Sequence, residues 1–291
     1  MRLVIENNVL RIEIQPNLGG KITSFYHKEK RFELSAQSNK KMEKLPGVCT
    51  GFGPYAFGMD DAFPNIDAEI IDWKGNSISY PDHGEIWAAE FRIMAQSSDC
   101  AVLAWESPMG YHYTKTLQLA QNTLRIHYEI KNNSNKELPC FWTWHGLMRY
   151  EEDMKVILPK GTTHCRNVLT GPELGDAGTV YPIDGSYDFT RVPKAESRTM
   201  SKFYVEHPVK EGRCGLHYPS WKVTCTMEYD AEKLPYLGFW ITAGGFQGDY
   251  NCALEPTNGF YDSVSTARKN GKLPILGAGE SMCFELAITL E

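Results

Sequence analysis

Three short segments, far apart in the sequence, each place an ionisable side chain beside glycine or proline and among apolar residues. They lie at 81–85, 142–146 and 253–259 and contain His83, His145 and Glu255. Imidazole titrates near ~6.5, so a histidine can give or take a proton at neutral pH. A carboxylate among apolar residues is partly desolvated, which raises its pKa toward the range of a useful base. Brought together, these groups could move protons on a neutral polyol such as a sugar.

Each of these residues also has a structural explanation that the sequence leaves open. Glu255 could pair with an arginine or with backbone amides at an edge turn, and a histidine beside aromatic residues is more often a satisfied core residue. If Phe141, Thr143 and His145 share one strand face, His145 lies opposite the neighbouring tryptophans. His83 precedes Gly84 in a turn, where histidine is commonly structural.

The elements that must position these residues are strands. Apolar and polar residues alternate with a period of two in 10–14, 124–130 and 282–290, which predicts strands with one face on a core. Gly- and Asn-rich turn segments separate the runs, and amphipathic helix patterns are scarce. We therefore expect an all-β protein, a large antiparallel β-sandwich that forms a single domain over residues 1–291.

Composition excludes several classes of function. The net charge is −6, and the basic clusters at 28–31 and 40–44 both contain glutamate, so we expect no nucleic acid or membrane partner. The sequence has no P-loop, no GxGxxG after a strand and no GxSxG elbow. Residues 1–7 lack the apolar region of a signal peptide. We expect a cytoplasmic protein that acts on a small molecule as a monomer or homodimer.

The eight cysteines form no CxxC pair, which argues against a zinc site. Cys140, Cys225, Cys252 and Cys283 fall in apolar strand patterns, where reduced cysteine acts as a small buried hydrophobe. His83 and Glu85 have the spacing of a metal-binding pair on one strand face, but no second such pair accompanies them. We expect no metal and no cofactor.

In order and spacing, several segments resemble the galactose mutarotase-like group, the aldose 1-epimerases and their relatives. The resemblance covers nearly the whole chain. The segments that carry it are residues 8–14 with 19–24, Asp82-His83-Gly84-Glu85-Ile86-Trp87, residues 131–134 with 139–145, and Ala253-Leu254-Glu255-Pro256 with Gly259.

This resemblance implies a β-supersandwich with its site on the concave face of one sheet. Glu255 would be the base that takes the proton of the anomeric hydroxyl, and His145 the acid that protonates the ring oxygen. His83 would bind the sugar, and Trp240, with Trp142 or Phe63 as further candidates, would offer it an apolar surface. The expected function is an aldose 1-epimerase that interconverts α and β anomers without a cofactor.

Two further carboxylates, Glu85 and Asp61, complete the set of residues that we expect to bind the sugar. A glycosidase remains an alternative, because it needs two carboxylates, and Glu85, Asp60 and Asp61 are possible partners of Glu255. The segment after His83-Gly84 is Glu85-Ile86-Trp87, where relatives that act on sugar phosphates carry arginine. Arginine is favoured for phosphate recognition, so we expect a free, non-phosphorylated sugar. The alternative functions are a non-catalytic carbohydrate-binding or sensing protein on the same fold, and a lyase or metal-dependent isomerase on a related sandwich.

Overall fold

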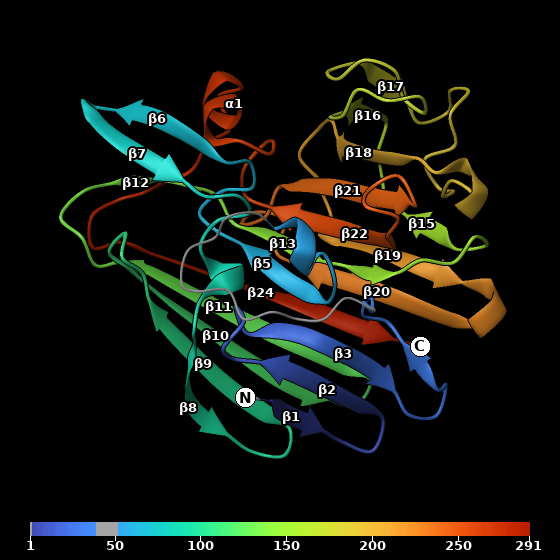
Figure 1. Ribbon diagram of the computed structural model, residues 1–291, viewed down its shortest axis with the longest axis horizontal. Helices are drawn as coiled ribbons and strands as arrows, with labels where there is room; N and C mark the ends of the chain where they lie inside the picture. The colour runs from blue at the N-terminus through green and yellow to red at the C-terminus, as the bar shows by residue number, and fades with distance from the viewer. Residues whose placement is uncertain (1, 39–51) are drawn as a thin grey trace.

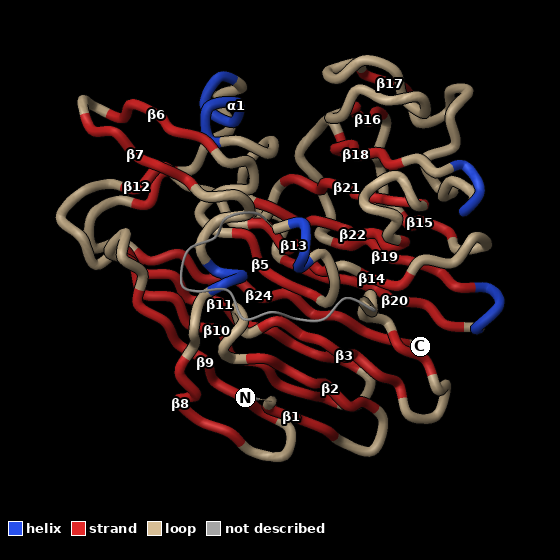
Figure 2. Tube along the Cα trace, viewed as in Figure 1, coloured by secondary structure: helices blue, strands red, loops and turns tan. Residues whose placement is uncertain are grey.

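The computed structural model describes residues 2–38 and 52–291, and strands dominate it (Figures 1 and 2). Two large sheets and two small hairpin-like sheets account for the named strands, and each named strand pair is antiparallel. The predicted all-β antiparallel sandwich is therefore confirmed. The basic cluster at 40–44 and Cys49 lie outside the described residues.

The larger sheet has twelve strands, and its main path runs β1-β2-β3-β5-β13-β22-β21-β18-β16-β17. Two short strands join from the side, since β4 pairs with β3 and β14 pairs with β22. Its strands are β1 Leu3–Glu6, β2 Leu10–Gln15, β3 Lys21–His27, β4 Phe32–Glu33, β5 Met59–Ala62, β13 Thr143–Gly146, β14 Met148–Arg149, β16 His164–Asn167, β17 Val180–Pro182, β18 Met200–Val205, β21 Tyr236–Ala243 and β22 Tyr250–Thr257.

The second sheet has eight strands in the order β15-β19-β20-β24-β11-β10-β9-β8, and two small sheets pair β12 with β23 and β6 with β7. The eight strands are β15 Lys155–Ile157, β19 Arg213–Tyr218, β20 Val223–Tyr229, β24 Ser281–Leu290, β11 Thr123–Asn132, β10 Tyr111–Ala120, β9 Cys100–Glu106 and β8 Arg92–Gln96. The small sheets comprise β12 Leu138–Pro139, β23 Ile275–Leu276, β6 Glu69–Trp73 and β7 Asn76–Tyr80.

Helices are few and short in the described chain. They are α1 Val264–Lys269 and the 3-10 turns η1 Gly53–Tyr55, η2 Ile86–Ala88, η3 Ala195–Ser197 and η4 Pro219–Trp221. None of the helices in residues 2–38 and 52–291 has the length and apolar character that a membrane crossing requires.

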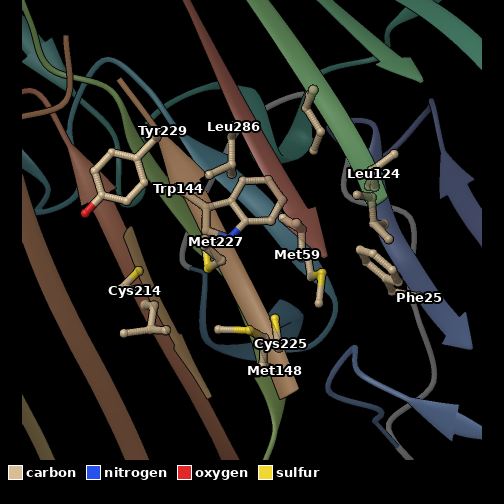
Figure 3. Packing of buried hydrophobic residues seen from close by; sticks show 14 of the residues in the cluster. Phe25, Met59, Leu124, Trp144, Met148, Cys214, Cys225, Met227, Tyr229 and Leu286 are labelled. Carbon is tan, nitrogen blue, oxygen red and sulfur yellow. The ribbon is translucent and has the colours of Figure 1, made fainter. Parts of the chain in front are cut away.

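The core fills the space between the two large sheets. Figure 3 shows Phe25, Met59 and Trp144 of the larger sheet facing Cys225 and Leu286 of the smaller one. The period-two pattern produces this layer, because in β11 the even-numbered residues from Leu124 to Asn132 are buried and most residues between them are exposed. The same alternation corrects one expectation: Cys283 is exposed, since it points away from the core face that Phe284 occupies.

The central strands of the larger sheet differ from the rest because they are buried on both faces. Every residue of β5 and β13 is buried, and so is β22 after Tyr250. One face packs on the sandwich core, and the other is covered by a smaller apolar cluster that includes Phe52, Trp87 and Leu147. Polar side chains on this second face are therefore held away from bulk water, and the candidate site lies there.

Candidate active site

The register of the larger sheet brings His145, Glu255 and Lys202 to one face. His145 lies on β13 and Glu255 on the neighbouring β22, while Lys202 lies two strands further on, on β18 beyond β21. On β21 the residue opposite Glu255 is Gly238, and a Cβ there would lie 3.0 Å from Glu255 Oε2. The missing side chain leaves room for the carboxylate at the centre of the site.

Glu255 has no exposed surface. Its Oε1 lies 3.6 Å from His145 Nε2, and its Oε2 forms an ion pair of 2.9 Å with Lys202 Nζ. Burial raises the pKa of the Glu255 carboxyl, and the positive charge of Lys202 offsets part of that rise. Neither carboxylate oxygen has a hydrogen-bond partner among the described residues, and Oε1 also lies outside the ion pair with Lys202, so Oε1 is left for a proton or a ligand.

Lys202 joins Glu255 to a second carboxylate. Its Nζ lies 3.0 Å from Asp262 Oδ1, which also accepts a hydrogen bond of 2.8 Å from the Tyr204 hydroxyl. Burial alone would lower the pKa of Lys202, but the charges of Asp262 and Glu255 raise it above its ordinary value. The ammonium is therefore charged throughout the physiological pH range.

His145 is neutral in the free protein near pH 7. Burial lowers the pKa of its imidazole well below the ordinary value, and the positive charges of His83, Lys202 and Lys21 lower it further. Its Nδ1 is buried without a hydrogen-bond partner in the described chain. The Phe52 ring meets the imidazole edge-on, with 5.0 Å between the ring centroids.

His83 completes the polar side of the site. Its ring stacks on Phe52 at 4.2 Å and meets His145 edge-on at 4.6 Å, while its Nδ1 lies 2.6 Å from Asp82 Oδ1. The residue has φ of +58°, an uncommon conformation outside glycine that is often found at functional sites. Gly84 follows with φ of +73°, and a Cβ there would lie 2.1 Å from the Phe63 carbonyl oxygen. Only glycine fits that approach, which fixes the turn that presents His83.

These side chains line a cavity of about 270 Å³, just below the range of about 300–1,000 Å³ that is typical of small-ligand sites. Glu255 lies beneath the lining, behind His145 and Lys202. The lining residues are Phe52, Ala56, Ile66, Asp67, His83, His145, Leu147, Leu169, Met200, Lys202, Trp240, Phe246 and Asp262. A largely apolar wall with a few converging polar groups is suited to a small, uncharged, hydroxyl-bearing ligand.

The structure brings four of the six predicted site residues together and places two elsewhere. Trp240 lines the cavity, and its Nε1 donates to Asn251 Oδ1 at 3.1 Å. Glu85 accepts hydrogen bonds from Ser107 and Tyr111 at 2.5 and 2.8 Å, and burial raises its pKa. Neither Glu85 nor Asp61 is among the cavity-lining residues.

Asp61 lies on the opposite face of β5 from the cavity. It pairs with Lys115 Nζ at 2.8 Å and accepts a hydrogen bond of 2.8 Å from the Tyr128 hydroxyl. Trp142 and Phe63 are both fully buried in the sandwich core. The core-facing position of Trp142 confirms the predicted separation of faces, in which His145 points away from the tryptophans on either side of Thr143.

Sequence reasoning missed Lys202 and Asp262. Lys202 stands directly before the apolar run Phe203-Tyr204-Val205, and a lysine in a buried strand needs a partner. That is a weak signal, and it does not identify the partner. Asp262 follows the predicted Glu255 segment but lies in a loop that no periodicity places.

A wider cleft of about 750 Å³ lies between the β6–β7 hairpin and residues 134–138. Its charged residues have partners, because Glu137 pairs with Lys74 at 2.6 Å and accepts a hydrogen bond from Trp73 Nε1 at 2.6 Å, and Lys136 Nζ donates to Asn76 Oδ1 at 3.2 Å. Lys74 is 68% exposed. The smaller cavity is the better candidate for chemistry because its acid–base groups are buried and incompletely paired.

A family comparison matches residues 107–290, more than half of the chain, to the family described as domain of unknown function (DUF4432). The chain belongs to the DUF4432 family. The matched region includes His145, Lys202, Trp240 and Glu255, whereas His83 precedes it. No curated protein matches the chain in a sequence comparison.

Solved structures with the same fold include three that align over the whole chain. Slr1438 from Synechocystis sp. PCC 6803 has a TM-score of 0.77 at 15% identity, with 100% of this chain and 96% of that chain covered. A galactose mutarotase-like protein from Lactobacillus casei ATCC 334 has a TM-score of 0.77 at 16% identity, with 100% of both chains covered.

A galactose mutarotase related enzyme from Lactobacillus acidophilus has a TM-score of 0.74 at 14% identity, with 100% of this chain and 97% of that chain covered. At these identities the similarity shows the fold. This DUF4432 protein therefore has the galactose mutarotase-like sandwich fold that its sequence resembles.

Proposed function

We propose that this protein is a mutarotase, an aldose 1-epimerase that interconverts the α and β anomers of a free, non-phosphorylated sugar. The observation that carries the proposal is the buried pair of His145, which lines a small aromatic-walled cavity, and Glu255 directly behind it. The fold shared with galactose mutarotase-like proteins supports it. The predicted single domain and the predicted roles of Glu255, His145, His83 and Trp240 remain part of this proposal, whereas Glu85 and Asp61 lie away from the cavity and are left out of it.

In the proposed reaction Glu255 takes the proton of the anomeric hydroxyl O1, and a C1=O1 double bond forms. The C1–O5 bond breaks, and its electron pair goes to O5, which takes a proton from His145. Rotation about C1–C2 and closure on the other face of the aldehyde reverse both transfers and give the other anomer. Protons and electrons balance over the cycle, and neither metal nor nucleotide takes part.

The electrostatics of the site suit this exchange. Burial raises the pKa of Glu255, which makes the carboxylate a stronger base, and lowers the pKa of His145, which makes the imidazolium a stronger acid. A positioned acid or base contributes about 10²–10⁴-fold to the rate. Because Glu255 lies behind His145 and Lys202, the anomeric hydroxyl must enter between those two side chains to reach it.

Trp240, Phe246 and Phe52 give the cavity an apolar wall, which can pack on the C–H face of a pyranose ring. His83 stacks on Phe52 beside His145 and would donate or accept a hydrogen bond with a sugar hydroxyl. The carboxylates Asp67 and Asp262 at the cavity disfavour an anionic substrate, in agreement with a non-phosphorylated sugar.

The test is anomer exchange followed by NMR from freshly dissolved single anomers of glucose, galactose and less common aldoses. Wild-type protein should accelerate the exchange of at least one sugar, while Glu255→Gln and His145→Asn should each lose most of that acceleration. Buffer without protein sets the spontaneous rate. Full activity of Glu255→Gln would refute the assignment of the base.

A non-catalytic sugar-binding protein is the second candidate. It is favoured by the position of Glu255 beneath the lining rather than in it, because a carboxylate that a ligand cannot reach serves only to hold Lys202 and His145. In that case sugars would shift protein resonances, and no sugar would change anomer faster than in buffer.

A further inference from the structure

Lys202 is 5% exposed and lies within β18, in the interior of the larger sheet. A buried ammonium is costly unless it is paired. Here two carboxylates hold it, at 2.9 Å from Glu255 and 3.0 Å from Asp262. An ammonium has three N–H donors, so these two contacts leave one for another acceptor.

The cavity provides the place for that acceptor, because Lys202 is itself a lining residue. His145 is neutral there, since burial keeps its pKa low. Lys202, in contrast, remains cationic at every pH near neutrality, because the charges of Asp262 and Glu255 raise its pKa. A positive donor that the protein holds in a fixed position acts on developing negative charge with little reorganisation.

We propose that Lys202 is a third catalytic residue of the proposed mutarotase, whose remaining N–H donates a hydrogen bond to the anomeric oxygen O1. This inference rests on the proposed function. Because Lys202 touches the same carboxylate that takes the O1 proton, an oxygen that reaches Glu255 also comes within reach of the ammonium.

The hydrogen bond from Lys202 to O1 should stabilise the transition state of ring closure most. The O5 hydroxyl attacks C1 and gives its proton to His145, while the C1=O1 π electrons move to O1, which recovers its proton from Glu255. Negative charge develops on O1 during this step, and the Lys202 ammonium stabilises it. Lys202 supplies a hydrogen bond and forms no bond to carbon.

An amine beside an open-chain aldehyde could instead condense with it to an imine. That route needs a neutral amine with a free electron pair, whereas Glu255 and Asp262 keep Lys202 protonated. Lys202 would therefore act through its positive charge and its hydrogen bond, and not through an imine with the sugar. Reduction with borohydride during turnover should leave no sugar attached to Lys202 in peptide mass spectra, and a sugar adduct on Lys202 would overturn the inference.

The kinetic test compares Lys202→Gln and Lys202→Arg with the wild type. Lys202→Gln keeps a hydrogen-bond donor without charge and should lower kcat by about 10²–10³-fold, the loss that follows removal of one donor to a developing oxyanion. Lys202→Arg keeps the charge and should recover part of that loss. Thermal unfolding of each variant shows whether it folds.

Lys115→Met is the matched control, since Lys115 is also a buried lysine paired with an aspartate but lies in the sandwich core. The readout that distinguishes catalysis from support is the pH profile of kcat/KM. The charge of Lys202 lowers the pKa of both Glu255 and His145, so Lys202→Gln should move both limbs to higher pH. Lys115→Met should move neither limb.

The outcomes separate the inference from the proposed function. Unchanged kcat in Lys202→Gln, or a loss of kcat without a shift of the pH limbs, overturns the catalytic role of Lys202. A wild type that shows sugar-induced NMR shifts without faster anomer exchange overturns the mutarotase and, with it, catalysis by Lys202. In that case a loss of those shifts in Lys202→Gln would still support the contact between Lys202 and the sugar.

Discussion

Two buried lysine–carboxylate groups, on opposite faces of the same sheet, show how structure and function differ in this molecule. The core pair, Lys115 and Asp61, joins the two sheets, and both carboxylate oxygens of Asp61 accept hydrogen bonds: Oδ2 from Lys115, which also donates to the Gly19 carbonyl, and Oδ1 from Tyr128. In the cavity cluster of Lys202, Glu255 and Asp262, neither oxygen of Glu255 has a hydrogen-bond partner among the described residues, although Oε2 is ion-paired with Lys202.

The two groups differ in how completely the charges that they bury are paired and hydrogen-bonded. Breaking a satisfied buried pair costs several kcal/mol because a charge is left unpaired, while such a pair contributes little that apolar residues could not. An incompletely satisfied carboxylate beside a cavity is an energetic liability, and sites of this kind are typical of binding and catalysis. We therefore propose a structural role for Asp61 and a chemical role for Glu255, and each of the following predictions tests that division.

Glu255→Gln should have the largest effect, a loss of about 10²–10⁴-fold in the rate of anomer exchange. Stability should change by less than about 1 kcal/mol, because Lys202 keeps Asp262 and the cost of a buried carboxylate disappears. NMR exchange rates and urea unfolding measure the two quantities. A large loss of stability would place Glu255 with the core pair.

Asp61→Asn should lower the free energy of unfolding by about 3–5 kcal/mol, because it leaves the Lys115 ammonium buried without its counter-charge. Activity per folded molecule should stay near that of the wild type. The double variant Lys115→Met/Asp61→Asn should regain part of the stability. If Asp61→Asn is stable but binds sugar poorly, Asp61 belongs to the site, as the sequence alone predicted.

The basic limb of the pH profile of kcat/KM should lie at lower pH than an ordinary histidine would give. His145 must carry a proton for ring opening, and burial lowers its pKa well below the ordinary value. Its proton is therefore lost at lower pH, so kcat/KM should rise as the pH falls from 8 toward 6, with a basic limb below the usual ~6.5 of imidazole. A basic limb above that value would mean that another group is the acid.

Glu85→Gln should have the smallest effect, changing kcat/KM by less than about threefold, because a group that does not touch the substrate has little differential effect on the transition state. Glu85 is occupied by Ser107 and Tyr111 away from the cavity. Trp240→Ala is the matched comparison, since Trp240 lines the cavity and its loss should raise KM. Equal effects of the two variants would contradict the boundaries of the site.

The sequence predicted the strands well because alternation of apolar and polar residues is a local property, visible in β2, β11 and β24. It also located His145 and Glu255, since a polar residue within a buried strand is conspicuous. Their distance was not predictable, because it depends on the pairing of β13 with β22. Lys202 was missed for the same reason, since its partners come from other strands and loops.

The predicted sugar-binding role of Asp61 shows that residue types alone do not predict which face of a strand a side chain occupies. Asp60 and Asp61 are adjacent in sequence, yet a strand turns them to opposite faces, so Asp60 pairs with Lys21 and Asp61 with Lys115. No property of the dipeptide says which face looks toward the cavity. Only the packing of the two sheets decides it.

The proposed reacting groups and the walls around them have different origins in the fold. His145, Glu255 and Lys202 stand on strands of one hydrogen-bonded sheet, whereas Phe52, His83, Leu169 and Phe246 reach the cavity from connecting segments. Strands hold their spacing rigidly, and loops tolerate exchange and insertion. Laboratory evolution confined to positions 52, 56, 169 and 246 should therefore change which sugar is accepted while leaving the proton-transfer geometry in place.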